Sequence, residues 1–317
     1  MSTSAQVLVV LSDESAGYQE VAEELRAGLT SVREGRTRMD VLTAQRLAGV
    51  DDAALNAYEL VVTIGLSAAQ ATMARESALA TPPLTLCLLI PRQSFARLSP
   101  ARTGGRERRV TAVFIDQPLS RQLDLIRLAL PDKHRVGVVL GPTSQALKDD
   151  LRDRARERAL QLKIAEVAEP SGVYGALQKV LPESDLLLAL PDPVAISSST
   201  VYGLLLTSYR AQVPVVGFSE GLVKAGALIS LFSTARQQGK QGAEIASRVL
   251  AGDAGLPAPQ YPRYFTVRVN ASVARSLGLR MTDEEALAST LASRGEPAGD
   301  ALRAHAISDA ATPKAGQ

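Results

Sequence analysis

The sequence is poor in the residues that build disulfides, metal centres and aromatic cages. Its 317 residues include one cysteine (Cys87), two histidines (His134 and His305), no tryptophan and only 4% aromatic residues. A lone cysteine cannot form an internal disulfide, and these three side chains leave a zinc site short of its usual ligands. We therefore expect no metal, and any ligand must be held by polar groups or by the few tyrosines and phenylalanines.

An excess of charge of one sign is also missing. Lys and Arg number 35 against 33 Asp and Glu, a formal charge of +2, which predicts neither a nucleic-acid partner nor an anionic membrane partner. The start of the chain lacks a basic segment, and the apolar run Val7 to Leu11 is far shorter than the about 20 residues of a membrane span. These features fit a cytoplasmic protein that starts natively at Met1, and equally a periplasmic or other extracytoplasmic protein whose leader has been removed.

What the sequence does contain is a repeated alternation of short apolar runs with stretches of helical spacing. The runs predicted as strands are residues 7–11, 39–42, 60–64, 84–90 and 111–115, followed by a second series at 135–140, 162–167, 185–190, 213–218 and 227–232. Continuously apolar strands separated by helices indicate parallel sheets that are covered on both faces. The predicted fold class is therefore α/β, with two doubly wound parallel-sheet lobes.

The same pattern predicts the division of the chain. We expect a first lobe of residues 6–117 with about 234–262, and a second lobe of residues 118–233. A closing strand and helix occupy 263–280, in a lobe that the pattern does not decide. Residues 284–317 turn to Ala, Ser, Gly, Pro and charge, which predicts a flexible tail that is helical only at its start.

One segment of the first series has the position of a catalytic serine turn. Gly65-Leu66-Ser67-Ala68-Ala69 follows a predicted strand and opens a helix, as a nucleophile elbow of the type G-x-S-x-G does, but its last residue is alanine. His134 lies at the amino end of a strand and His305 in the predicted tail, so neither is placed to act as the base. No phosphate-binding glycine loop of either common type is present. We therefore expect no enzyme activity, no catalytic residues and no nucleotide cofactor.

Two other interpretations of this segment stay open. The backbone amides of Ser67, Ala68 and Ala69, at the start of a helix, are suited to attract a carboxylate or another anion. Alternatively, Ser67 is a simple helix N-cap.

The loops that follow the strands of the second series carry hydroxyl and acidic groups among turn-forming residues. These loops contain Gly141-Pro142-Thr143-Ser144, Pro191-Asp192-Pro193 and Ser219-Glu220-Gly221. Each loop alone is explained by a turn and a helix cap. Because ligands of parallel sheets bind beyond the carboxyl ends of the strands, their occurrence at one edge favours a binding site.

Arg92 directly follows a predicted strand, whereas Arg102, Arg106, Arg108 and Arg109 lie in a polar loop that we expect to stay in solvent. If Arg92 points toward the ligand, its guanidinium offers a planar pair of donors to a carboxylate.

Several stretches resemble a known family. They are 122–131, 135–139 and 213–228, of which Ser219-Glu220-Gly221-Leu222-Val223-Lys224-Ala225-Gly226-Ala227-Leu228 is the most specific, with 239–250, 267–270 and 274–279. Over about residues 7–279 the chain resembles the ABC transporter substrate-binding proteins of the type that includes tryptophan and tyrosine receptors.

The resemblance implies a type I periplasmic binding protein fold, in which two lobes close on a small molecule. It implies ligand contacts in the first lobe from Ser12, Asp13 and Ser67. In the second lobe it implies contacts from residues Gly141 to Ser144, Asp192 and Glu220.

Two functions follow as expectations. The first is a receptor for an amino acid or another small carboxylate that serves an ABC permease, with no role for metal or nucleic acid. The second is a regulatory module of the same fold that senses a ligand or binds a partner. For both we expect hinge residues at Asp116 to Pro118 and around Ser233.

Overall fold

The computed structural model describes residues 5–30, 37–77, 79, 81–98, 109–252 and 255–294. These residues form two compact units. Unit 1 contains residues 5–116 and 233–264, and unit 2 contains residues 117–232 and 265–294. The chain thus passes from one unit to the other at Asp116–Gln117, Phe232–Ser233 and Tyr264–Phe265.

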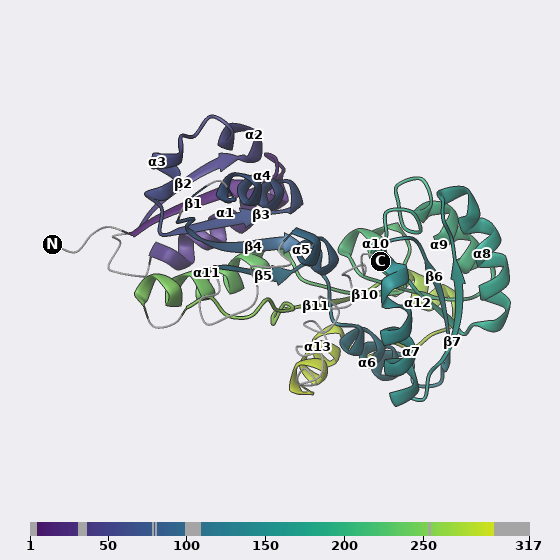
Figure 1. The fold of residues 1–317 in the computed structure, drawn as a ribbon. Helices are drawn as coiled ribbons and strands as arrows, with labels where there is room; N and C mark the ends of the chain where they lie inside the picture. Colours follow the sequence, from purple (N-terminus) through teal and green to yellow (C-terminus); the bar gives the residue numbers. More distant parts are fainter. Residues whose placement is uncertain are drawn as a thin grey trace. The chain divides into compact units, whose positions relative to one another are not determined.

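Unit 1 is a parallel sheet with strand order β2-β1-β3-β4-β5 and helices on both faces (Figure 1). Its strands are β1 (Ala5–Leu11), β2 (Thr37–Thr43), β3 (Leu60–Ile64), β4 (Leu84–Ile90) and β5 (Val110–Phe114). Its helices are α1 (Ala16–Thr30), α2 (Ala44–Leu47), α3 (Asp52–Asn56), α4 (Leu66–Glu76), α5 (Arg92–Leu98) and α11 (Ala235–Ala251).

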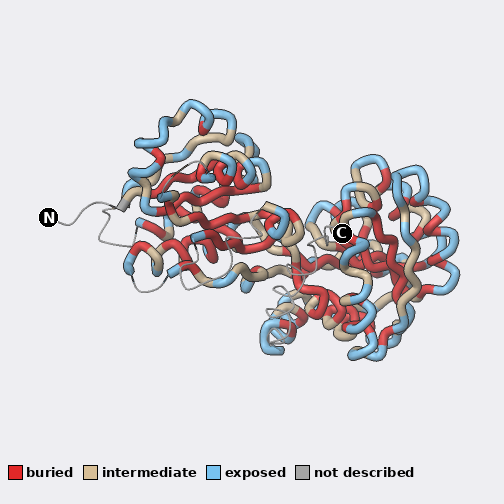
Figure 2. The backbone as a smooth tube through the Cα atoms, in the orientation of Figure 1, coloured by how far each residue is buried: buried red, intermediate tan, exposed pale blue. Residues whose placement is uncertain are grey.

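The continuous apolar character of β1 explains why this sheet is covered twice. Val7, Val9 and Leu11 belong to the core that the sheet shares with α1 and α11. Leu8 and Val10 belong to the core on the other face, with residues of α2, α3 and α4. Successive side chains of a strand point to opposite faces, so an uninterrupted apolar run fits only a sheet between two helix layers. Figure 2 shows these strands as buried and the outward faces of the helices as exposed.

Unit 2 repeats this arrangement with one additional strand. Its sheet has the order β11-β10-β9-β8-β6-β7, in which only β11 is antiparallel to its neighbour. The strands are β6 (Arg135–Leu140), β7 (Gln161–Glu166), β8 (Leu186–Leu188), β9 (Val215–Gly217), β10 (Ile229–Phe232) and β11 (Thr266–Val269). The helices are α6 (Leu119–Ala129), α7 (Lys148–Glu157), α8 (Val173–Val180), α9 (Val201–Arg210), α10 (Glu220–Ala225), α12 (Ala271–Ser276) and α13 (Glu284–Ser293), with short 3-10 helices at Ser144–Leu147, Pro170–Gly172 and Leu181–Glu183.

The two faces of the second sheet are again separate cores. Val138 and Leu188 pack with α6, α7, α12 and α13, whereas Val139 and Leu187 pack with α8 and α9. The predicted class of two doubly wound parallel sheets is confirmed. Each of the ten predicted strands is present, several of them shorter than the apolar run that predicted it. The closing strand lies in unit 2, because β11 pairs with β10.

The predicted helical start of the segment from Glu284 onward is present, but its packing on unit 2 was not expected. Glu284 to Ser293 form α13, and Leu287 and Leu291 on that helix are only 2% and 4% exposed in the core of unit 2. Asp283 caps the helix by accepting hydrogen bonds from the amides of Glu285 and Ala286. One apolar pair four residues apart is enough to dock a short helix on an existing core. Residues 295–317 lie outside the described residues.

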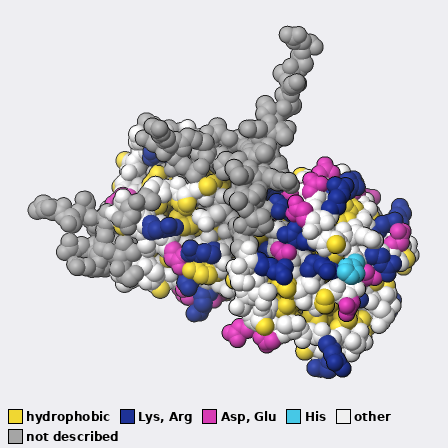
Figure 3. Space-filling model, turned by 90° about the horizontal axis from the view of Figure 1, so that it is seen from below, with side chains coloured by type: hydrophobic (Ala, Val, Ile, Leu, Met, Phe, Trp, Pro, Cys, Tyr) yellow, Lys and Arg dark blue, Asp and Glu magenta, His cyan; other side chains and the backbone are white. Residues whose placement is uncertain are grey.

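In the described part of the chain, no helix has the length and apolar character of a membrane span. On the face drawn in Figure 3, Lys and Arg side chains are interspersed with Asp and Glu. This agrees with the nearly balanced charge of the sequence.

Candidate functional site

Both sheets have their topological switch point at the strands that carry predicted site residues. In unit 1, β1 lies between β2 and β3, and the chain direction across the sheet reverses there; β6 has the same place between β7 and β8. Loops beyond the carboxyl ends of strands at such a point separate and leave room for a ligand. Ser12 and Ser67 follow β1 and β3, and Thr143 and Asp192 follow β6 and β8.

In unit 1, Ser12 joins the loop after β1 to the start of α4. Its Oγ accepts a hydrogen bond of 3.0 Å from the backbone amide of Ala68. Gly65 precedes α4 with a φ of +89°, and a Cβ at that position would lie 2.5 Å from Ser12 Oγ. Glycine is therefore required twice, by its backbone conformation and by the close approach of Ser12.

This bond reduces the predicted anion site at the start of α4 to Ser67. The Ala68 amide is used by Ser12, and the Ala69 amide donates to the carbonyl of Gly65 at 3.2 Å, so neither is available to a ligand. The N-cap position is Gly65, and Ser67 is an exposed residue of the first turn whose side chain caps nothing. The alternative interpretation of Ser67 as the N-cap is therefore wrong. The amide and hydroxyl of Ser67 remain as polar groups at this corner.

Tyr18, on α1, is a further residue of this corner. Its ring lies against Gly65 and Ser12, and a Cβ on Gly65 would be 2.9 Å from the Tyr18 hydroxyl. Burial and the charge of Asp13 raise the pKa of Tyr18, with a hydrogen bond to Ser12 as a smaller opposing effect. Asp13 itself is exposed, and its carboxylate accepts from the Ser15 amide at 2.8 Å, which turns the chain into α1.

Arg92 follows β4, at the carboxyl edge of the unit 1 sheet, and its backbone is fixed by a hydrogen bond. Its amide donates to the Asp116 carboxylate at 2.7 Å, so the loop after β5 caps the helix α5 that follows β4. The half-buried Arg92 guanidinium forms no hydrogen bond with the described residues. Burial raises the pKa of Asp116, and hydrogen bonding and the charge of Arg92 oppose this only in part. Asp116, expected only as a hinge residue, thus also positions Arg92.

In unit 2, Asp192 is the centre of a hydrogen-bond network rather than a free acidic group. One carboxylate oxygen accepts from the amides of Thr143 and Ser144 at 3.0 and 2.8 Å and from the Ser144 hydroxyl at 2.9 Å. The other oxygen accepts from the amides of Val194 and Ala195 at 2.8 and 3.0 Å. Asp192 is 4% exposed. It therefore joins the loops after β6 and β8 and has little capacity left for a ligand.

The charge of Asp192 is stabilised by these donors. Burial alone would raise the pKa of Asp192, but hydrogen bonds from three amides and from the Ser144 hydroxyl outweigh it, so this pKa lies below its usual value. Gly141 is part of the same network, because its amide donates to Ser144 Oγ at 3.0 Å. A Cβ on Gly141 would overlap the Asp192 carboxylate.

The remaining predicted residues of unit 2 differ in whether their side chains already have a partner within the protein. The Thr143 side chain is half-buried, and its hydroxyl forms no hydrogen bond with the described residues. Glu220 is exposed at the start of α10 and pairs with Lys224 one turn later at 3.1 Å. The hydroxyl of Ser144 is used within the loop.

The predicted residues therefore separate into two groups. Ser12, Gly141, Ser144 and Asp192 build the loops, while the side chains of Ser67, Arg92 and Thr143 form no hydrogen bond with the described residues. Within the described residues no cluster of His, Cys, Asp and Glu is suited to hold a metal ion. Cys87 is buried in the sheet, and burial raises the pKa of its thiol to about 12. Of the four arginines expected in a solvated loop, Arg102, Arg106 and Arg108 lie outside the described residues, and Arg109 is exposed.

Comparison with solved structures agrees with this architecture. The ABC domain from Streptococcus pneumonia in complex with L-Trp matches with a TM-score of 0.60 and 16% identity, over 88% of this chain and 96% of that one. A substrate binding protein with adhesive properties from Clostridium difficile, in a ligand-free, open structure, matches with a TM-score of 0.70 and 14% identity, over 89% and 97%. The fold is that of the type I periplasmic binding proteins, as the resemblance implied.

The sequence itself gives the family. The model of the family described as ABC transporter substrate binding protein matches residues 52–291. The chain belongs to this family, whose members are solute-binding proteins. The tyrosine-binding protein of Clostridioides difficile is 23% identical over 137 residues, which are 42% of this chain and 39% of that protein. The match thus spans about two fifths of the length of that relative.

Proposed function

We propose that the protein is an extracytoplasmic receptor that binds a small carboxylate, in particular an amino acid, and delivers it to an ABC permease without chemical change. The observation that carries the proposal is Arg92, a half-buried guanidinium at the carboxyl edge of a doubly wound sheet that forms no hydrogen bond with the described residues. The likeness to proteins named for L-Trp and tyrosine supports an amino acid as the ligand class.

Each available group has a role in this proposal. Arg92 binds the ligand carboxylate through two parallel hydrogen bonds, which its planar guanidinium favours over a lysine ammonium. The Ser67 amide and hydroxyl, at the positive end of α4, stabilise the same charge. Thr143 gives a hydroxyl from unit 2. Asp192 and Ser12 act indirectly, since they fix the loops on which these groups lie.

Hydrogen bonds on both sides of the crossings define where the chain can bend. On the unit 1 side, Ser233 Oγ donates to the Tyr264 carbonyl at 2.6 Å. This hydrogen bond joins the chain link at Phe232–Ser233 to the link at Tyr264–Phe265. On the unit 2 side, the Arg121 guanidinium donates to Gln117 Oε1 at 2.7 Å and lies 4.3 Å above the centre of the Phe265 ring. Because both sides are braced, we place the hinge in the peptide links between them.

Ligand-dependent stabilisation tests the proposal. Thermal unfolding is measured with L-tryptophan, L-tyrosine, small carboxylates, purines and sugars. A true ligand at 100 times its Kd adds about 2.7 kcal/mol of stability, a shift of a few degrees for a protein of this size. We expect shifts from carboxylates alone. A shift from sugars or purines with none from carboxylates would contradict the proposed ligand class, and no shift at all would contradict the receptor function.

A further inference from the structure

Strand β4 contains a residue in a backbone conformation that strands do not normally contain. Leu89 has a φ of +52°, in the left-handed region. The other non-glycine residues of the described chain with a positive φ, Ala159 and Gln212, lie two residues beyond α7 and α9, where helices commonly end in this way. Leu89 follows no helix. Because a bulky residue in this conformation costs free energy, the surrounding structure must hold it there.

The conformation of Leu89 coincides with a β-bulge between β4 and β5. Leu88 pairs with Val113 and Ile90 pairs with Phe114, so Leu89 is an extra residue without a partner on β5. A bulge bends its strand and changes the direction of the side chains that follow it. Bulges are frequent beside functional sites for this reason.

The packing of β4 shows that the bulge exchanges the two faces of the strand. Leu88 and Leu89 are neighbours in the chain, yet both contact the core that the sheet shares with α1 and α11. Ile90 lies in the core on the other face, together with Phe95 of α5. In a regular strand, alternate residues share a face, and Ile90 would lie beside Leu88. The extra residue therefore places Ile90, and the chain that follows it, on the opposite face.

The segment after the bulge is then fixed to the segment after β5. The Ile90 carbonyl accepts a hydrogen bond of 3.1 Å from the Ile115 amide, and the Arg92 amide donates to the Asp116 carboxylate at 2.7 Å. A shift of one residue moves every side chain of a strand to the other face. Leu89 therefore determines on which side of the sheet the Arg92 side chain begins.

We propose that Leu89 is a positioning residue for ligand binding, whose left-handed backbone directs the Arg92 guanidinium toward the ligand carboxylate. This role belongs to the backbone of residue 89 and not to the apolar contacts of its side chain. The inference rests on the proposed function, because it takes Arg92 as the group that binds the carboxylate. Residue 89 should accordingly accept a residue that favours a positive φ and reject a β-branched residue.

Two substitutions separate the backbone of residue 89 from its side chain. Leu89→Asn removes the apolar contacts but keeps the conformation, because asparagine adopts the left-handed region more readily than most residues. Leu89→Ile keeps the apolar volume, but a β-branched residue strongly disfavours a positive φ. The matched control is Leu88→Ile, the same exchange at the neighbouring residue, which is not among those with a positive φ.

Hydrogen exchange of the ligand-free protein tests the backbone part of the proposal. In Leu89→Ile the amides of Arg92 and Ile115 should exchange at least tenfold faster than in the wild type, because their hydrogen bonds depend on the bulge. In Leu89→Asn and Leu88→Ile they should exchange within threefold of the wild type. Unchanged exchange of both amides in Leu89→Ile would overturn the proposal.

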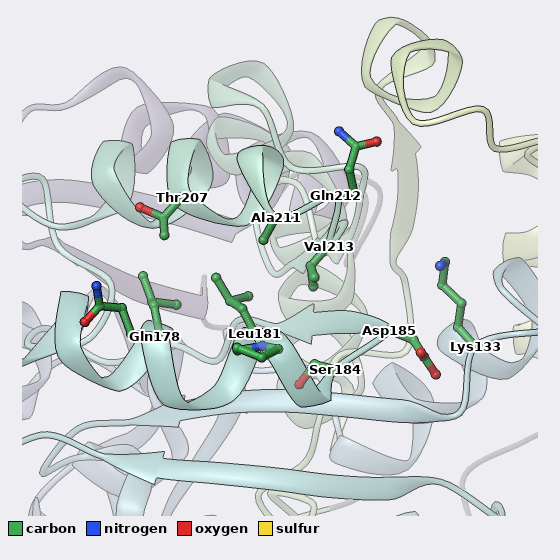
Figure 4. A pocket seen from close by; sticks show the side chains of 11 residues that line it. Lys133, Gln178, Leu181, Ser184, Asp185, Thr207, Ala211, Gln212 and Val213 are labelled. Carbon is green, nitrogen blue, oxygen red and sulfur yellow. The ribbon is translucent and has the colours of Figure 1, made fainter.

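A groove of unit 2 supplies an internal reference for this experiment. It has a volume of about 650 Å³, and Ser184 and Val213 are among the residues that line it (Figure 4). The amides of both residues are hydrogen-bonded within unit 2, at 3.1 and 2.9 Å. Their exchange should be the same in all variants, which distinguishes a local change around β4 from global unfolding.

Calorimetric titration with L-tryptophan and with L-tyrosine tests the binding part. Leu89→Ile should raise Kd at least tenfold, and Leu89→Asn and Leu88→Ile less than threefold. Because Leu89 acts through Arg92, adding Leu89→Ile to Arg92→Ala should raise Kd less than threefold further. If the two effects are additive, or if Leu89→Asn weakens binding tenfold, the proposal is wrong. Should Leu89→Ile not fold, the result with Leu89→Asn decides alone.

The same titrations distinguish failure of this inference from failure of the proposed function. Wild-type binding by Arg92→Ala would overturn the proposed function and this inference together. Weakened binding by Arg92→Ala, with wild-type binding by Leu89→Ile, would overturn only the inference.

Discussion

The side chain of Asp192 occupies the space that any side chain on Gly141 would need. Gly141 follows β6 and Asp192 follows β8, so this contact joins the two loops at the switch point of the second sheet. The sequence requirement for glycine at 141 is thus set by a residue that lies far away in the chain.

Gly141→Ala should therefore destabilise the protein by about 1 to 3 kcal/mol, because the added methyl group must displace a buried and fully bonded carboxylate. Urea unfolding measures the effect. The control is Gly17→Ala in the first turn of α1, where a Cβ would meet nothing within 4 Å. That variant should be neutral or slightly more stable. Equal changes in the free energy of unfolding at the two positions would show that the contact with Asp192 does not limit what residue 141 can be.

Asp192→Asn should cost about 2 to 4 kcal/mol, because an amide nitrogen cannot accept the hydrogen bonds that one carboxylate oxygen now accepts. The lowered pKa sets the pH dependence. The contribution of Asp192 is fully present above the unfolded pKa of about 3.9 and is lost as the pH falls through the folded value. The exposed Glu220→Gln should change stability by less than about 0.5 kcal/mol. If Asp192→Asn lowered the free energy of unfolding as much at pH 2 as at pH 7, this account would be contradicted.

The contribution of Asp116 to stability should depend on pH in the opposite direction. Its pKa is raised by burial, so the folded state binds the proton more tightly than the unfolded state, and the stability contribution falls as the pH rises through the folded pKa. Asp116→Asn stays neutral and can still accept from the Arg92 amide. We expect this variant to be more stable than the wild type at pH 7 and equal to it at pH 3. Lower stability of the variant at pH 7 would show that the charge of Asp116 is needed where it is.

Arg92→Lys and Arg92→Ala should each weaken binding of a carboxylate ligand about tenfold or more, the cost of about 1.4 kcal/mol or more for a charged hydrogen-bond pair. Calorimetric titration measures it. The matched control is Arg97→Ala, which removes an exposed arginine of the same helix, α5. It should change Kd less than threefold. If all three variants bind as the wild type does, Arg92 does not recognise the ligand.

The packing of α13 on the core of unit 2, which the sequence did not predict, gives a further test. Leu287→Ala and Leu291→Ala should each cost about 2 to 5 kcal/mol, as for other buried leucines. Thr290→Ala, on the exposed side of the same helix, should have little effect. Thermal or urea unfolding of the three variants decides whether the helix belongs to the core of unit 2.

The sequence was sufficient for the fold but only in part for the site. Uninterrupted apolar runs such as Val7 to Leu11 specify a strand between two helix layers, and the loops after such strands must lie at one edge of the sheet. Position at this edge was therefore predictable for Ser12 and Asp192. Their roles were not, because the bonds of Ser12 to Ala68 and of Asp192 to Thr143 join residues 56 and 49 positions apart.

Short elements were also difficult to predict. The docking of α13 depends on two leucines, Leu287 and Leu291, in a segment whose composition is otherwise that of a tail. Tyr18 and Asp116 were missed as site residues because their signal is spatial: one lies against the loop after β3, the other caps the helix after β4. Packing and long-range hydrogen bonds, rather than local pattern, determine such placements.

The central claim is that Arg92 and the start of α4 bind the carboxylate of the ligand. Hydrogen exchange of the backbone amides, with and without the amino acid or carboxylate that most raises the melting temperature, tests this claim most directly. We predict slower exchange at residues 65–68, 92–93 and 141–144, with no change in the helices α8 and α9. Protection confined to α8 and α9, with unchanged exchange at these residues, would contradict the account.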